Sequence, residues 1–193
     1  MKKRNTLTSL AVLVLFVFFT MAHTSCKKED DNNNPSTETA DFKVSLKSTN
    51  SSRSAYDSIL IDIQNISIHV STDTSATSGW FDLETNVGIY DLIDYTSGND
   101  TILALDSLLE VQTVSQIRLL LGPNNTIVED SVSYDLETPG AQSSGIKIQV
   151  HTELQPNTAY KVVLNFDPGS SIIKTGNGKY KLKPVIDASV IEL

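Results

Sequence analysis

The sequence is poor in the residues that most metal and disulfide chemistry requires. Its 193 residues include one cysteine and three histidines. A single cysteine cannot form an intramolecular disulfide. A zinc site needs several cysteine or histidine side chains that converge on one point. The sequence therefore favours neither a disulfide-stabilised fold nor a zinc protein.

Recognisable catalytic motifs are also lacking. The chain has no Gly-x-Ser-x-Gly turn, no His-Glu-x-x-His pair, no phosphate-binding loop and no dinucleotide fingerprint. His69 and His151 lie between apolar residues of alternating segments, so we expect both imidazoles to face solvent. These features favour a protein that is not an enzyme and has no cofactor. The catalytic alternative is a glycan-acting enzyme with two carboxylates from distant strands.

Positive charge is scarce. The chain has 15 lysines and arginines against 23 aspartates and glutamates, a net charge of −8. Such a surface repels the phosphate backbone of nucleic acids and anionic lipid headgroups. We therefore expect no nucleic-acid partner.

Long apolar runs are absent except at the amino terminus. Residues 10–19 form an unbroken apolar run, preceded by the basic residues 2–4 and followed by residues 23–26, His-Thr-Ser-Cys. A membrane-spanning helix needs about 20 apolar residues. The shorter run, with its basic start, is typical of a secretory signal. Residues 1–25 are therefore predicted to be a signal peptide.

The end of this segment resembles a bacterial lipoprotein signal, in which Cys26 becomes the lipidated first residue of the mature protein. His23 stands where the usual motif has leucine, but relaxed versions ending in Ser-Cys occur in Bacteroidetes-type lipoproteins. Residues 27–31, Lys-Lys-Glu-Asp-Asp, resemble the acidic tag that directs such proteins to the cell surface. The resemblance implies a surface-exposed outer-membrane lipoprotein, held in the membrane through lipid on Cys26. The alternative for Cys26 is a free thiol after an ordinary signal peptide. The alternative for residues 27–31 is a solvated linker.

Residues 26–41 are predicted to be a flexible acidic tether. They are rich in Asp, Asn, Ser and Thr and have no large apolar side chain. Such a composition cannot offset the entropy cost of ordering. Removing residues 1–25 takes away three positive charges and moves the net charge from −8 to −11. Residues 42–193 then form one domain, long enough to bury a core of its own.

Period-two alternation of apolar residues predicts an all-β domain, an antiparallel β-sandwich of about eight strands with an Ig-like or transthyretin-like Greek key. Apolar residues stand at odd positions from 59 to 63 and at even positions from 66 to 70. One extra residue at Gln64 or Asn65 therefore turns the strand over, by a β-bulge or by crossing between sheets. Gly176-Asn177-Gly178 predicts a hairpin. Residues 101–110 show helical spacing over two turns and stay ambiguous.

Four segments suggest a family when taken in order. They are Gly79-Trp80, residues 90–94 (Tyr-Asp-Leu-Ile-Asp), residues 115–119 (Ser-Gln-Ile-Arg-Leu) and residues 174–186 around the hairpin. Together they resemble a bacterial lipoprotein domain of unknown function, family four-three-eight-two. The resemblance covers residues 42–188 and implies a secreted or lipid-anchored β-sandwich. The family carries no established activity, so no catalytic residue can be transferred.

Arg118 lies within an apolar strand, where an unpaired charge is costly. We expect it to reach a carboxylate, with Asp91 and Asp94 as the candidate partners. The alternative is that Arg118 holds an anionic ligand. Trp80 is expected to be a core or inter-sheet aromatic residue.

The loop after residue 90 is a weak calcium candidate. Asp91, Asp94, Asn99 and Asp100 supply oxygen atoms around a glycine, as hard cations prefer. The spacing does not fit an EF-hand. A solvated loop is the favoured interpretation, because turns are rich in these residues.

Four hydroxyl residues follow an aspartate and precede an aliphatic residue: Ser58, Thr101, Ser107 and Ser131. This pattern resembles the O-glycosylation signal of secreted Bacteroidetes proteins. It also arises by chance in strands rich in Ser and Asp.

The function favoured by these observations is a binding or adhesion module at the cell envelope, whose partner is a glycan or a surface protein. Trp80 or Tyr95 would stack on sugar rings, and the recognition loops would be residues 71–79, 96–100, 122–125 and 138–145. The alternative is a structural, fimbria-like envelope component, for which Arg53 is a possible processing site.

Overall fold

The computed structural model describes residues 39–49, 56–71, 79–95, 99–109 and 113–193. The predicted signal peptide, the lipidation site Cys26 and Arg53 lie outside these ranges. None of the described helical residues makes a helix long and apolar enough to cross a membrane.

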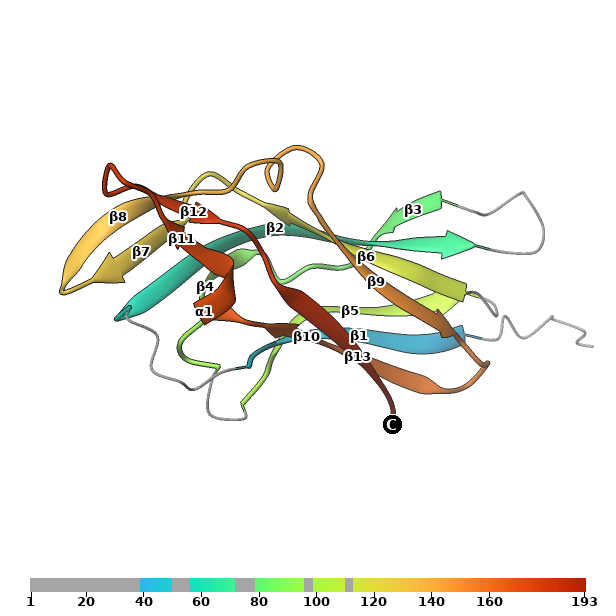
Figure 1. Cartoon of the computed structure of the whole chain (residues 1–193). Helices are drawn as coiled ribbons and strands as arrows, with labels where there is room; N and C mark the ends of the chain where they lie inside the picture. Colours follow the sequence, from blue (N-terminus) through green and yellow to red (C-terminus); the bar gives the residue numbers. More distant parts are fainter. Residues whose placement is uncertain (1–38, 50–55, 72–78, 96–98, 110–112) are drawn as a thin grey trace, which may run out of the picture. The chain divides into compact units, whose positions relative to one another are not determined.

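The described residues form two sheets (Figure 1). The smaller sheet has the order β13-β10-β1-β5, with bounds β1 (Thr39–Ser48), β5 (Thr101–Leu109), β10 (Ala159–Phe166) and β13 (Ile186–Glu192). The larger sheet has nine strands: β2 (Ser58–Ser71), β3 (Gly79–Asp82), β4 (Gly88–Asp91), β6 (Thr113–Leu121), β7 (Thr126–Glu129), β8 (Val132–Glu137), β9 (Ile146–Glu153), β11 (Ile172–Lys174) and β12 (Tyr180–Leu182). One short helix, α1 (Pro168–Ser171), precedes β11.

This architecture confirms the predicted all-β sandwich and differs from the prediction in three details. The described residues contain thirteen strands instead of about eight, because five of these strands have only three or four residues and show no periodicity of their own. The sandwich is not wholly antiparallel, because β1 and β10 pair in parallel, as do β8 and β12. Strand β1 begins at Thr39, so residues 39–41 of the predicted tether belong to a strand, and Ala40 is buried.

Strand β2 is the longest strand, at 14 residues, and it carries partners on both edges. Ile63 pairs with both β4 and β6, and Leu60 pairs with both β4 and β7. A residue has one neighbour on each side, so β6 and β7 lie end to end along the edge opposite β4. By the same argument, since Ser67 pairs with both β3 and β6, β3 lies along the same edge of β2 as β4.

A β-bulge produces the change of side-chain face that the sequence predicted within β2. The register against β6 shifts between Ile63 and Asn65, and β2 remains within the nine-stranded sheet on both sides of the shift. Ile63 and Ile66 are both buried. The bulge therefore lets both halves of one strand face the same core.

The ambiguous segment 101–109 is strand β5. Its register against β1 shifts at Val44/Ser45, so that Ala104 pairs with Val44 and Ile102 pairs with Ser45. Leu103 is left between them and is buried together with Ala104. This bulge breaks the period of two and produces the spacing that looks helical in the sequence.

In the described residues, apolar side chains from both sheets form one core. The fully buried large side chains include Phe42, Leu46, Ile59, Ile68, Leu103 and Ile117. Burial of each such side chain contributes about 1.5–3 kcal/mol. A core of this kind stabilises the domain without a disulfide.

The predicted hairpin is confirmed, with β11 and β12 paired around it. Gly178 has a φ of +70°, and its amide donates a hydrogen bond to the Thr175 carbonyl oxygen at 3.1 Å. Glycine at this position avoids the steric cost that a side chain would add in the left-handed region.

Asp62 organises the turn between β6 and β7. It is buried, and its carboxylate accepts hydrogen bonds from the backbone and side-chain nitrogens of Asn124, both at 3.1 Å, and from Gln64 Nε2. The Asp62 amide donates to Asn125 Oδ1 at 2.9 Å. A methyl group on Gly122 would overlap the carboxylate. The turn of residues 122–125 therefore wraps around a buried charge of β2.

Asp62→Ala is expected to lower the free energy of unfolding by about 1–3 kcal/mol, because it leaves the Asn124 donors without their buried acceptor. Urea unfolding of this variant, with Asp94→Ala as the control at an exposed aspartate, measures the difference. Equal losses in the two variants would contradict this role of Asp62.

Candidate functional site

The outward face of the nine-stranded sheet carries two neighbouring rows of paired residues, one from each of β3, β2, β6 and β9. The first row consists of Asp82, Ser67, Arg118 and Lys147. The second row consists of Trp80, His69, Gln116 and Gln149. Directly paired residues share a face, and the alternate residues Ile66 and Ile68 are buried. Both rows therefore point away from the core.

Trp80 is the centre of this face. The guanidinium carbon of Arg118 lies 4.5 Å from the indole centroid, and Lys147 Nζ lies 5.7 Å from it. The His69 ring meets the indole edge to face, with centroids 5.2 Å apart. We call Trp80, His69, Arg118 and Lys147 the Trp80 platform. The distances to both cations are within the range of cation–π attraction.

The expectation that Trp80 belongs to the core is wrong. Its side chain is half-buried and pairs opposite His69, on the face of β2 that points away from Ile68. His69 itself is half-buried, and its Nδ1 lies 2.9 Å from Ser115 Oγ. His151 is exposed, as expected.

Arg118 meets a carboxylate, but not one of the predicted ones. Its Nη2 donates to Ser67 Oγ at 3.0 Å and lies 4.0 Å from Asp82 Oδ1. Gly145, with a φ of +72°, packs so closely that a Cβ there would come within 2.6 Å of Arg118 Cγ. Ser67, Asp82 and Gly145 thus fix the guanidinium over the indole.

The prediction that Asp91 or Asp94 pairs with Arg118 is wrong, because β4 lies beside the other half of β2. The Asp91 carboxylate accepts hydrogen bonds from the Ile59 amide at 3.1 Å, the Ile93 amide at 3.0 Å and the Ser58 hydroxyl. Its role is to join β4 to the start of β2. Asp94 is exposed.

The four weak calcium candidates have different surroundings. Within the described ranges no three His, Cys, Asp or Glu side chains are placed to hold a metal ion. Asp91 has the backbone contacts given above, and Asp100 forms an ion pair with Lys161 of β10. Asp94 and Asn99 are exposed. Calcium binding by this segment stays a prediction.

The four candidate glycosylation residues have different surroundings. Ser107 and Ser131 are exposed, whereas Ser58 and Thr101 are half-buried. The Ser107 hydroxyl donates to Asp41 Oδ1 at 2.7 Å. Glycosylation of these hydroxyls stays a prediction.

Two of the expected recognition loops and the expected stacking residue Tyr95 have structural roles. The loop of residues 122–125 surrounds Asp62, with Asn125 buried, and the loop of residues 138–145 buries Thr138 and Ala141. Tyr95 packs against the core. Residues 72–78 and 96–98 of the other two predicted loops lie outside the described ranges. Among the described surfaces, the outward sheet face is therefore a better candidate for recognition than the loops of residues 122–125 and 138–145.

Residues 39–184 match the family model described as Domain of unknown function (DUF4382). The chain belongs to the DUF4382 family. The match begins at the first residue of β1 and ends two residues before β13, so it contains the whole Trp80 platform. No curated protein and no solved structure matches the chain.

The sequence indicated only part of the Trp80 platform and of the residues that support it. Trp80 and Arg118 stood out in the sequence, but Ser67, Asp82 and Lys147 did not. The signal that joins them is the register of four strands, which brings residues as far apart as 82 and 147 into one row.

Asp82 is held in its charged form. The hydrogen bond from the Ser67 hydroxyl, at 2.7 Å, is the main cause that lowers the pKa of this carboxyl; the hydrogen bond from Asn65 Nδ2 adds to it, and the charge of Arg118 contributes less. A carboxyl whose pKa is lower in the folded than in the unfolded chain stabilises the fold above the unfolded pKa. That contribution disappears as the pH falls through the folded pKa.

Ser67→Ala is expected to raise the pKa of Asp82 toward its ordinary value, and by more than Arg118→Gln does, because the direct hydrogen bond outweighs the more distant charge. Carboxyl carbon chemical shifts followed over acid pH measure both variants. A larger rise in Arg118→Gln would show that the ion pair dominates instead.

Proposed function

We propose that this DUF4382 member is a lipid-anchored, non-catalytic binding module of the cell envelope, and that the Trp80 platform is its surface for anionic glycans. The observation that carries the proposal is the placement of two cations against one outward-facing indole. The lipoprotein-like signal ending at Cys26 and the polar segment after it support display on a membrane.

The charges around Trp80 favour an anionic ligand. The chain as a whole has a net charge of −8, so a pair of neighbouring cations on one face is a local exception. Arg118 shares its charge with Asp82, whereas Lys147 has no ion pair among the described residues. A carboxylate or sulfate group can form charge-assisted hydrogen bonds with both side chains. The apolar face of a sugar ring can then pack beside the indole.

The sheet lowers the ordering cost of binding for three of the platform residues, and the exposed Lys147 is the exception. The four platform residues lie on β2, β3, β6 and β9, and β2 and β6 are hydrogen-bonded on both edges. Side chains that are held by a sheet and by their own hydrogen bonds lose little freedom when a ligand arrives.

The hydrogen bonds of Ser115 and His69 favour a structural role for this pair over a catalytic one. Ser115 Oγ also donates to the carbonyl oxygen of His69 at 3.2 Å, which directs its proton to the backbone and away from the imidazole. A nucleophilic serine must give its proton to a base. This geometry supports a non-catalytic role.

A structural, fimbria-like role is the second candidate, and one observation favours it. Strand β13 stands at the edge of the four-stranded sheet, and Val190, Ile191 and Leu193 at its end are exposed. An exposed edge strand with apolar residues can pair with a strand of another chain.

Cys26→Ser is expected to abolish incorporation of labelled palmitate and to release the protein from the membrane fraction, because the acyl chains have lost their attachment atom. Ser25→Ala is the matched control, since it keeps a small residue before the cysteine. Membrane retention of the Cys26→Ser variant would contradict the lipid anchor.

Lys147→Gln is expected to weaken binding to dextran sulfate by about tenfold, because a charge-assisted hydrogen bond contributes about 1.5–3 kcal/mol. Trp80→Ala should weaken it at least as much. Biolayer interferometry on immobilised protein measures both, with Lys183→Gln as a control that removes one exposed lysine elsewhere.

Neutral dextran serves as the matched polymer, and we expect no binding to it. Binding to dextran sulfate should also weaken as salt is added. Equal binding of the two polymers would contradict the proposal that the Trp80 platform binds anionic glycans. Unchanged binding by both Lys147→Gln and Trp80→Ala would also contradict it.

A further inference from the structure

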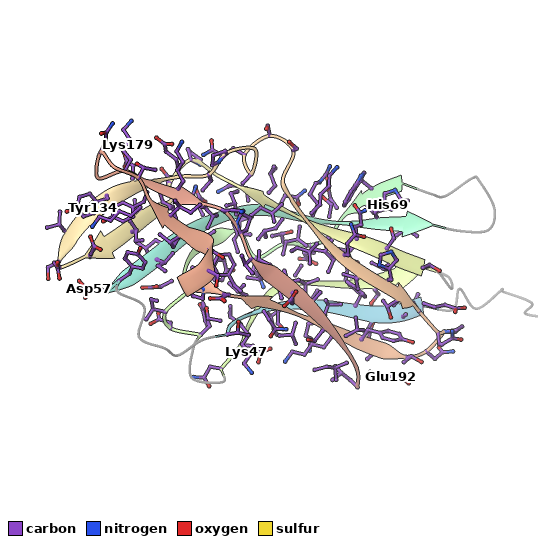
Figure 2. All side chains as sticks on the ribbon, in the orientation of Figure 1. Lys47, Asp57, His69, Tyr134, Lys179 and Glu192 are labelled. Atoms are coloured by element: carbon purple, nitrogen blue, oxygen red, sulfur yellow. The ribbon has the colours of Figure 1, made fainter. Side chains whose placement is uncertain are left out.

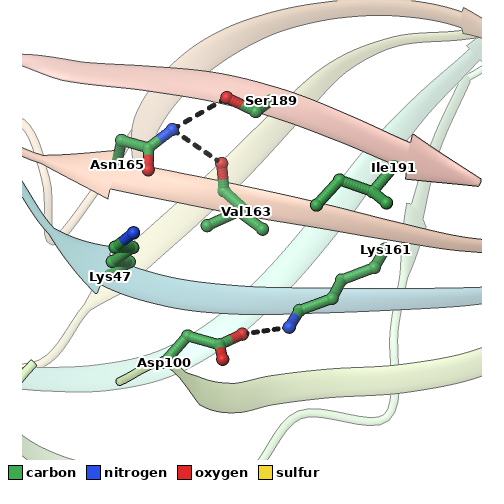
Figure 3. A pocket seen from close by; sticks show the side chains of 7 residues that line it. All are labelled: Lys47, Asp100, Lys161, Val163, Asn165, Ser189 and Ile191. Carbon is green, nitrogen blue, oxygen red and sulfur yellow. Dashed lines mark hydrogen bonds and ion pairs between the residues drawn. The ribbon is translucent and has the colours of Figure 1, made fainter. Parts of the chain in front are cut away.

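A pocket of about 280 Å³ lies on the four-stranded sheet, on a different sheet from the Trp80 platform. Figure 2 labels Lys47 in the four-stranded sheet and His69 in the larger one. The pocket is lined by residues of β1, β10 and β13 and by the residue before β5 (Figure 3): Lys47, Asp100, Lys161, Val163, Asn165, Ser189 and Ile191.

The register explains why these side chains gather. Lys47 pairs with Asn165 across β1 and β10, and Val163 and Lys161 pair with Ser189 and Ile191 across β10 and β13. Paired residues share a face, so three strands contribute to one outward surface.

The pocket has an excess of one positive charge. Lys161 Nζ forms an ion pair with Asp100 that crosses β1 (Figure 3). Lys47 has neither an ion pair nor a hydrogen bond from its ammonium group within the described part of the chain. The ammonium group of Lys47 is therefore available to an anion that enters the pocket.

Asn165 adds an oriented acceptor. Its Nδ2 donates to Ser189 Oγ at 2.9 Å and to the Val163 carbonyl oxygen at 3.5 Å, which leaves Oδ1 turned away from β13 (Figure 3). An amide held in this way can accept a hydrogen bond from a hydroxyl group without first reorienting.

Apolar surface completes the pocket. Val163 is 8% exposed and lies between the polar groups, and Ile191 is 45% exposed at one side. The volume is just below the range of about 300–1,000 Å³ for pockets that hold drug-sized ligands. The pocket thus has the size for one small molecule.

We propose that this pocket binds a small organic carboxylate that also carries hydroxyl groups. The carboxylate lies against Lys47 Nζ, a hydroxyl group donates to Asn165 Oδ1, and the carbon skeleton contacts Val163 and Ile191. The Lys161–Asp100 pair forms another part of the wall.

The test is calorimetric titration of the full-length lipoprotein in detergent micelles with sodium glucuronate, and with glucose as the neutral analogue. We expect saturable binding of glucuronate alone. Lys47→Gln should weaken it by about tenfold or more, because one charge-assisted hydrogen bond is lost. Lys43→Gln removes the same charge from the same strand outside the pocket and should change the affinity less than about twofold.

Three results would overturn the proposal: no saturable glucuronate binding, equal affinities for glucuronate and glucose, or equal affinities of the wild type and Lys47→Gln. Trp80→Ala separates this site from the platform. Glucuronate binding should survive that substitution, and its loss would place the carboxylate on the Trp80 platform instead.

Discussion

The pairing of one long strand along both of its edges is the constraint on which the larger sheet depends. Strand β2 holds β3 and β4 on one side and β6 and β7 on the other. Such an arrangement requires a continuous strand whose two halves face the same core. The bulge at Ile63/Asn65 meets that requirement, because it absorbs the one residue that would otherwise turn half of the strand over.

The same strand determines where function can lie. Its inward residues fill the core, so its outward residues are free to carry polar groups. At one end the outward Asp62 secures the turn between β6 and β7, and at the other end Ser67 and His69 support Trp80 and Arg118. The core and the proposed binding surface therefore use alternate residues of one strand. The four-stranded sheet follows the same rule, with its pocket on the face away from the core.

Sequence patterns predicted the features that depend on neighbours along the chain. Alternation located the strands, the change of parity located the β2 bulge, and the glycines located the β11–β12 hairpin. The prediction failed where a bulge disturbed the period, as in β5, and where strands were too short to show one. The partner of Arg118 was also wrong, because Asp82 reaches it through strand pairing, and the sequence carries no direct record of that pairing.

By itself the sequence determined the class of fold, the acidic character of the chain and its family, because these follow from composition, periodicity and motifs. The tertiary structure alone decided which side chains meet. Residues 80, 118 and 147 become neighbours through the antiparallel registers of four strands. Residues 47 and 165 become neighbours through the parallel pairing of β1 and β10, which are more than one hundred residues apart in the sequence. Register depends on how two sheets bury their apolar faces together, a property of the packed core and not of any one segment.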